Sequence, residues 1–302
     1  MAALVTISDS VRSAFKQKTP VVALESTVIA HGLPHPVNVK TALACEGEIR
    51  SRGAEPATIA IIDGKPVVGL SVENLHSVGT RRDVEKVNLS NMASTMASGR
   101  WGATTVAATM RIAQFCAIKV FSTGGIGGIH KDYAVTGDMS ADMTALASIP
   151  MIVVCSGAKS ILDLPRTLEF LETAGCPVVG VGTNEFPAFH SRTSGLAVDF
   201  AAKTPAEVAE IAIAHWRLGA QTAVLAVVPV PAEFEIPAKE LDGMINEALS
   251  HATEIGIRGK AVTPYLLAEL ERLSGGATLR ANTALLLNNA GHAADIAAAL
   301  RS

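Results

Sequence analysis

Two side chains, Lys159 and Glu25, stand where the sequence most favours chemistry. Each lies at or just beyond the end of a short, uncharged apolar run, residues 151–155 for the lysine and residues 21–24 for the glutamate. Such runs are typical of strands buried on both faces of a parallel sheet, and ligands bind outside the carboxyl ends of these strands. A lysine there can act as a nucleophile, and a half-buried carboxyl with a raised pKa can act as a general acid. The alternative interpretation of Lys159 is a solvated loop lysine.

The segment GDMSADM carries two carboxylates, Asp138 and Asp142, on either side of Ser140. Oxygen ligands of this kind suit Mg²⁺ or Mn²⁺, which is often held by a single carboxylate together with waters and substrate oxygens. The same residues would also cap the free amides at the start of a helix. Their spacing leaves both interpretations open.

Three further segments contain residues that could contact an anionic ligand. The glycine-rich loop 124–128, followed by Lys131, matches neither GxGxxG nor GxxxxGK, so it indicates neither a dinucleotide fingerprint nor a Walker loop. In GATTVAATM, Thr105 and Val106 lie at the start of a predicted helix, where amides and hydroxyls bind phosphate or where the threonine simply caps the helix. The third candidate is Lys86 in EKVNLSN.

The composition points to a small-molecule partner. Of 302 residues, 49% are hydrophobic and 18% are charged, and the net charge of −3 offers no broad basic field for nucleic acid. No apolar run reaches the roughly 18 residues of a membrane helix, and the first residues lack the pattern of a signal peptide. The four cysteines show no CxxC spacing and are typical of reduced thiols. We therefore expect a cytoplasmic enzyme without a membrane or nucleic-acid partner.

Strand patterns alternate with helix patterns over most of the chain, which predicts an α/β fold with a largely parallel sheet. No linker divides it, so we expect one domain over residues 1–302. The predicted strands are 21–24, 58–62, 119–122, 151–155, 178–181 and 222–228. The predicted helices are 38–52, 103–117, 142–147, 164–174 and 205–218, followed by a helical C-terminal block of 239–255, 264–273 and 282–300. Ser160 and Asp163 are both possible caps of helix 164–174, and Pro165 favours Asp163.

Several of these segments together resemble the pseudouridine-5'-phosphate glycosidase family, which has the indigoidine synthase A-like fold. The similar segments are VVALESTVIAHGLPHP, GATTVAATM, IKVFSTGGIGGIHK, DMSAD, VVCSGAKSILDL, PAFHSRTSG and TPYLLAELERLSGG, in the family's order and at about its spacing. The resemblance implies a three-layer α/β/α fold, assembly as a homotrimer and use of a divalent cation, usually Mn²⁺. It also implies reversible conversion of pseudouridine 5'-phosphate and water into uracil and ribose 5-phosphate, an activity classed among the carbon–oxygen hydro-lyases.

The resemblance also implies residue roles. The proton donor would be Glu25, the nucleophile that forms a Schiff base with ring-opened ribose would be Lys159, and the metal ligand would be Asp138. The implied substrate contacts are Lys86, Val106, Ser140, Ala141, Asp142 and Asn282, and we add Thr105 and Lys131 as phosphate candidates. One departure is that Leu89, Ser90 and Asn91 stand where the family pattern has Arg-Arg-Asp, and Gly137 is smaller than expected.

Two other functions remain open at this point. One is a different Schiff-base lyase or aldolase that acts on a phosphosugar and shares Lys159 but not uracil. The other is a non-catalytic protein that binds a phosphosugar.

Overall fold

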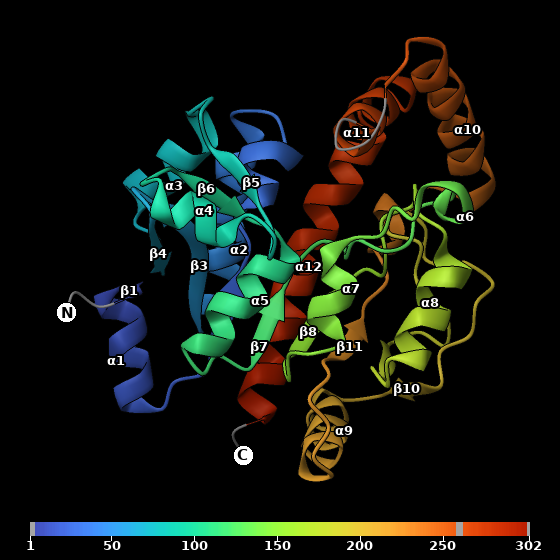
Figure 1. The fold of residues 1–302 in the computed structure, drawn as a ribbon. Helices are drawn as coiled ribbons and strands as arrows, with labels where there is room; N and C mark the ends of the chain where they lie inside the picture. Colours follow the sequence, from blue (N-terminus) through green and yellow to red (C-terminus); the bar gives the residue numbers. More distant parts are fainter. Residues whose placement is uncertain (1–3, 258–261, 301–302) are drawn as a thin grey trace.

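The computed structural model describes residues 4–257 and 262–300, and within them eleven strands form one sheet (Figure 1). Nine strands follow one another across it, in the order β1 (Thr6–Ile7), β4 (Lys65–Val68), β3 (Glu55–Ile62), β2 (Val21–Leu24), β7 (Val120–Ser122), β8 (Ile152–Cys155), β11 (Val224–Val227), β9 (Val178–Val181) and β10 (Phe200–Ala202). The other two are β5 (Glu85–Val87) and β6 (Gly102–Thr104). β6 pairs with β3, and β5 pairs with β6. All pairs are parallel except those of β3 with β4 and with β6.

Helices cover both faces of the sheet, which makes three layers. Side chains alternate between the faces along the central strands, so Val153 packs in one core cluster and Val154 in the other. The first core lies under α1 (Asp9–Gln17), α5 (Val106–Phe115), α7 (Ala141–Leu146), α8 (Leu164–Thr173), α10 (Ala238–Glu254) and α11 (Val262–Leu273). The second lies under α2 (Val37–Ser51), α9 (Pro205–Arg217) and α12 (Ala277–Ala299). The predicted α/β fold with a largely parallel sheet is confirmed.

Shorter helices connect these elements. They are the π-helix η1 (Val28–Gly32), α3 (Val72–Thr80), α4 (Met92–Ala97), α6 (Tyr133–Thr136) and the 3₁₀-helix η2 (Ala232–Phe234). No helix in the part of the chain that the structure describes is long and apolar enough to cross a membrane.

The C-terminal helices divide into two parts. Helix α12 packs on β2, β7 and β8 and against α2 and α9, so it runs along one face of the sheet. Helices α10 and α11 pack on each other and extend beyond the sheet (Figure 1). Of the C-terminal helices, α12 is thus the one that lies against the central strands of the sheet.

Two local predictions had different outcomes. Helix α8 begins at Leu164 after its N-cap Asp163, whose side chain accepts the Arg166 amide, so the later start is confirmed. The predicted helix 103–117 begins too early, because Ala103 and Thr104 belong to β6, which pairs with distant strands β3 and β5. Non-local pairing of this kind overrides a local helical pattern.

Candidate active site

The backbone around Glu25 is attached on one side to β6. Ser26 Oγ accepts the Thr104 amide at 2.9 Å, and Thr27 Oγ1 donates to the Ala103 carbonyl at 3.2 Å. On the other side, the Thr123 hydroxyl, which follows β7, donates to Glu25 Oε1. Glu25 is therefore held at the carboxyl end of β2 between two neighbouring segments.

Lys159 lies on a loop that is hydrogen-bonded to the glycine-rich loop. After β8, the Ser156 amide donates to the Gly124 carbonyl at 2.8 Å, and the Lys159 amide donates to the Ile126 carbonyl at 3.1 Å. Gly157 has φ +80°, and a Cβ there would lie 2.0 Å from the Pro187 carbonyl oxygen. The turn before Lys159 therefore requires glycine.

Four of the predicted site residues line one cavity of about 60 Å³. They are Glu25, Lys86, Lys159 and Asn282, which come from the ends of β2 and β8, from β5 and from α12. Thr27, His31, Thr123 and Phe189 also line it. The fold thus brings together the implied proton donor, the implied nucleophile and two implied substrate contacts.

The charged groups of this cavity shift one another's pKa values. Burial raises the pKa of Glu25, while the charge of Lys159, the Thr123 hydrogen bond and Lys86 counteract part of this increase. Loss of water around Lys86 and the like charge of Lys159 lower the pKa of Lys86, and Glu25 and Asp142 oppose this decrease. A neutral Glu25 can donate a proton, so the environment favours a general acid at this position.

Asp142 does not line this cavity, but its charge acts on two residues that do, Glu25 and Lys86. Its carboxylate accepts the Ala107 amide at 3.0 Å and the Gly127 amide at 2.8 Å, and so joins the first turn of α5 to the glycine-rich loop. Ser140 is the N-cap of α7 and accepts the Asp142 amide, and Ala141 is the first residue of that helix. A Cβ at Gly127 would lie 2.3 Å from Ser140 Oγ, so the close approach of these loops requires glycine.

Thr105 and Val106 begin α5 next to the strand that carries Lys86. Thr105 is the N-cap, and its own amide donates to the Val87 carbonyl at 2.9 Å. Val106 is 2% exposed, so its side chain packs in the core and its backbone is the part available for contact with a substrate. The start of α5 lies beside the cavity without lining it.

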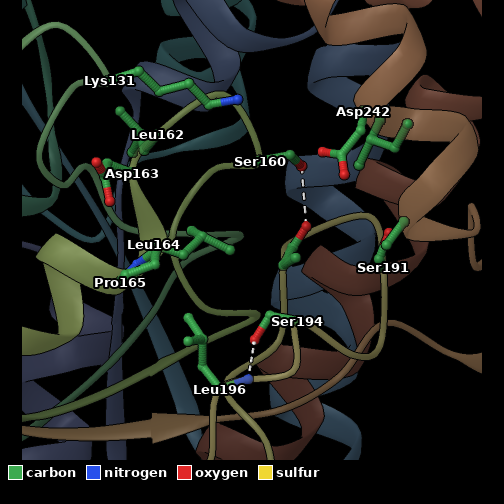
Figure 2. Close-up of a pocket in the computed structure, with 13 residues that line it drawn as sticks. Lys131, Ser160, Leu162, Asp163, Leu164, Pro165, Ser191, Ser194, Leu196 and Asp242 are labelled. Carbon is green, nitrogen blue, oxygen red and sulfur yellow. Dashed lines mark hydrogen bonds between the residues drawn. The ribbon is translucent and has the colours of Figure 1, made fainter.

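Lys131 lies in a different cavity, of about 430 Å³. Figure 2 shows it across this space from Asp242, with Ser160 between them. The two cavities are lined by neighbouring residues of the same loop, since Ser160 lines the larger cavity and Lys159 the smaller one. The structure therefore does not bring Lys131 together with Glu25.

Asp138 lies on the same exposed segment as Lys131, after α6. Its carboxylate is 3.9 Å from His130 Nε2, and its side chain is 48% exposed. Gly137, which ends α6, has φ +67°, a conformation that favours glycine and accounts for the small residue there.

The donor chemistry of this segment suits a hydrated cation. Among residues 4–257 and 262–300, no three His, Cys, Asp or Glu side chains converge on a common point where they would hold a metal. An accessible carboxylate such as Asp138 nevertheless fits an Mg²⁺ or Mn²⁺ ion that keeps most of its water ligands. Asp138 would then be the protein ligand and water would complete the shell.

Several residues of the small cavity were not predicted. Thr123 directly follows a buried strand, which is a signal that sequence analysis could have used. His31 lies on η1, where burial and the charge of Lys86 lower its pKa. Phe189 has φ +62° and its ring packs edge-on against His190 at 4.6 Å, and neither feature has a pattern in the sequence.

The segment that departs from the family pattern supports Lys86 through its backbone. Asn91 Nδ2 donates to the Lys86 carbonyl at 3.1 Å, and Asn91 Oδ1 accepts the Asn88 amide at 2.9 Å. Asn91 thus closes the turn after β5 without an arginine.

Comparison with known proteins places the chain in a family. Residues 10–299 match the family model described as indigoidine synthase A like protein. The chain belongs to this family. It is 47% identical over 300 residues to a pseudouridine-5'-phosphate glycosidase of Caldanaerobacter subterraneus subsp. tengcongensis, covering 99% of this chain and 98% of that one. It is 48% identical to the protein of that name from Solibacter usitatus, covering 98% and 99%.

Two solved structures of related proteins have the same fold. The prealnumycin C-glycosynthase AlnA in complex with ribulose 5-phosphate is 38% identical and superposes with a TM-score of 0.92. The superposition covers 100% of this chain and 98% of that one. An indigoidine synthase A-like protein from Thermotoga maritima is 35% identical and superposes with a TM-score of 0.90, covering 100% of this chain and 99% of that one. The predicted family and fold are therefore confirmed.

Proposed function

We propose that the protein reversibly cleaves the C–C glycosidic bond of pseudouridine 5'-phosphate to give uracil and ribose 5-phosphate. The observation that carries the proposal is the meeting of Glu25 and Lys159 in one cavity, with Lys86 and Asn282 beside them. The relatives that share nearly half of its residues over their full length are named for this activity.

Cleavage of a C–C bond explains why this pair differs from the two carboxylates of ordinary glycosidases. Pseudouridine has no leaving heteroatom that an acid could protonate at the glycosidic bond. The ring oxygen O4' of the ribose is the available site of protonation. A carboxyl group that stays neutral and an amine nucleophile suit a route that opens the ribose ring.

In this route the free amine of Lys159 attacks C1' while the C1'–O4' bond breaks, and Glu25 gives its proton to O4'. The nitrogen of Lys159, now bonded to C1', returns its extra proton to Glu25, and Glu25 then protonates C5 of uracil as the C1'–C5 bond breaks and C1' becomes an iminium carbon bonded to Lys159. Water adds to this carbon and gives a proton back to Glu25, and release of the aldehyde form of ribose 5-phosphate restores the amine of Lys159. Each step uses only water, substrate and the two side chains.

Lys86 and Asn282, which line the same cavity as Lys159, would bind the substrate. Lys86 carries a charge that suits the 5'-phosphate. Desolvation and the charge of Lys159 lower the pKa of Lys86, while the negative charges of Glu25 and Asp142 raise it and so favour the charged amine. Asn282 supplies an amide from α12, and Phe189 adds an aromatic surface that suits a pyrimidine. The start of α5, with Thr105 and Val106, offers further amides and a hydroxyl next to Lys86.

Asp138 would hold the divalent cation, Mn²⁺ by family resemblance, through one carboxylate and water. The ion would supply positive charge to anionic substrate oxygens when bound. The same resemblance leads us to propose a homotrimer, and exposed apolar side chains such as Phe115, Val135 and Leu218 are available for subunit contacts. Light scattering coupled to size-exclusion chromatography would give three times the 31.3 kDa chain mass.

One structural relative favours a second candidate. The C-glycosynthase neighbour is described in complex with a pentose phosphate and is named for formation of a C-glycoside. The same lysine and acid could serve a C–C bond between ribose 5-phosphate and an aromatic acceptor other than uracil.

Incubation with pseudouridine 5'-phosphate and Mn²⁺, followed by chromatography of uracil, tests the main proposal. We expect uracil release, and pseudouridine 5'-phosphate formation from uracil and ribose 5-phosphate. Absence of both reactions would contradict the proposal. Covalent capture of ribose 5-phosphate without either reaction would favour the second candidate.

A further inference from the structure

Asn289 is a fully buried polar residue of α12 that contacts the loops on both sides of the candidate site. It is 0% exposed. Its Nδ2 donates to the Thr123 carbonyl at 2.9 Å and to the Gly124 carbonyl at 3.3 Å. It also bonds the hydroxyl of Ser156, 3.1 Å from Nδ2 and 3.3 Å from Oδ1. One side chain therefore joins the end of β7 to the end of β8.

Each of these contacts leads to a residue that the proposed mechanism uses. Thr123 is the residue whose hydroxyl donates to Glu25. Ser156 begins the loop that carries Lys159, and its amide donates to the same Gly124 carbonyl that Asn289 contacts. The proton donor and the nucleophile are thus connected through a single amide.

Helix α12 presents Asn282 and Asn289 on one face, because seven residues make about two helical turns. Asn282 lines the cavity, while Leu285 and Leu286 lie between the two asparagines and would be 3.2 Å from a Cβ at Gly124. The apolar residues fix the distance of the helix from the glycine-rich loop, and Asn289 fixes the orientation of the loop carbonyls. A purely apolar residue at 289 would remove the Asn289 donor from the Thr123 carbonyl and would leave the Gly124 carbonyl with the Ser156 amide as its donor.

We propose that Asn289 is a positioning residue that fixes the position of Glu25 relative to Lys159. The inference rests on the proposed function, because it concerns the two residues that the reaction would use. Asn289 lies outside the cavity lining and so acts through Thr123 and Ser156.

The substitution Asn289→Asp tests this directly, because it keeps the shape and replaces the donating NH₂ with oxygen. We expect kcat for uracil release to fall about 100-fold, the loss that a misplacement of about 1 Å produces, with little change in KM. Asn288→Asp is the matched control on the preceding residue, since Asn288 Nδ2 donates to the Pro229 carbonyl, at 3.5 Å, and not to Thr123, Gly124 or Ser156. This control should keep kcat within about threefold of wild type.

The pH profile separates positioning from a general loss of stability. If Thr123 shifts, Glu25 loses a hydrogen bond that lowers its pKa, so the alkaline limit of kcat/KM should move to higher pH. Thr123→Val should produce the same shift, and Ser156→Ala should lower kcat without it. These two variants test the inference even if Asn289→Asp does not fold, which thermal unfolding would show.

The outcomes distinguish the inference from the function beneath it. Uracil release by the wild type, together with a lowered kcat in Asn289→Asp or in both Thr123→Val and Ser156→Ala, supports the inference. An active wild type whose folded variants keep the wild-type kcat and pH profile overturns the inference alone. A wild type that releases no uracil overturns the proposed function, and the inference with it.

Discussion

The cavity around Glu25 and Lys159 and the segment that carries Lys131 and Asp138 differ in how the fold holds them. Glu25 and Lys159 follow buried parallel strands, and hydrogen bonds to β6, β7 and the glycine-rich loop fix the backbone beside them. Lys131 and Asp138 are exposed, and the four-residue helix α6 lies between them. The fold holds the first pair by non-local contacts and the second largely by local ones.

This difference suggests a division of roles between the two regions. A reaction that makes and breaks bonds at C1' needs groups held within fractions of an ångström. A hydrated cation tolerates more movement, because water ligands adapt to the distance. Substitutions of Glu25 and Lys159 should therefore act mainly on kcat, and a substitution of Asp138 on the affinity for the cation.

The largest effect is expected from Lys159→Met, which removes the amine and keeps most of the volume. Loss of a covalent nucleophile should lower kcat for uracil release by at least about 10⁴-fold. Lys40→Met is the control, because Lys40 is exposed on α2, away from the cavity lining. Wild-type turnover by Lys159→Met would refute the assignment of Lys159 as the nucleophile.

The next effect is expected from Glu25→Gln, which keeps the shape but cannot donate an acid proton. We expect kcat to fall about 10²–10⁴-fold, with substrate binding retained in calorimetry. The raised pKa of Glu25 keeps the wild-type carboxyl protonated to higher pH, so activity should fall as pH rises through that pKa. A wild-type alkaline limit that Glu25→Gln leaves unchanged would show that another group supplies the proton.

Paired substitutions of Lys86 and Lys131 test the comparison between the regions. Lys86→Met should raise KM about 10–100-fold, the loss expected for a charge-assisted contact to phosphate. Lys131→Met should change KM by less than about threefold, because Lys131 lies in the other cavity. The reverse order would mean that the phosphate binds on the Lys131 side of Ser160.

A smaller effect than that of Lys86→Met is expected from Asp138→Asn. We expect the Mn²⁺ concentration that gives half-maximal rate to rise about tenfold, with kcat recovered at high Mn²⁺, because an amide oxygen is a weaker ligand than a carboxylate. Asp132→Asn, on the same exposed segment, is the control. An unchanged Mn²⁺ requirement in Asp138→Asn would exclude Asp138 as the ligand.

The parts of the fold that the sequence predicts are those whose signal is local. The buried strands Val21–Leu24 and Val178–Val181 have the predicted bounds, since continuous apolar runs mark them. The three-residue strands β5 and β6 are absent from the prediction, because they are defined by the pairing of β5 with β6 and of β6 with β3.

The candidate site follows the same rule. Glu25 and Lys159 could be selected because each lies at or beyond a strand end, and the resemblance added Lys86 and Asn282 to them. Phe189 and Asn289 could not be selected in this way. The conformation of Phe189 and the three loop contacts of Asn289 arise only when the ends of β7, β8 and β9 meet α12.

Borohydride trapping tests the central claim most directly. Reduction of the protein in the presence of ribose 5-phosphate converts an imine into a stable secondary amine, and peptide mass spectrometry locates it. We predict one pentose phosphate adduct on Lys159, which Lys159→Met abolishes and Lys40→Met retains. Absence of an adduct, or an adduct confined to Lys86 or another lysine, would contradict the assignment of Lys159 as the nucleophile.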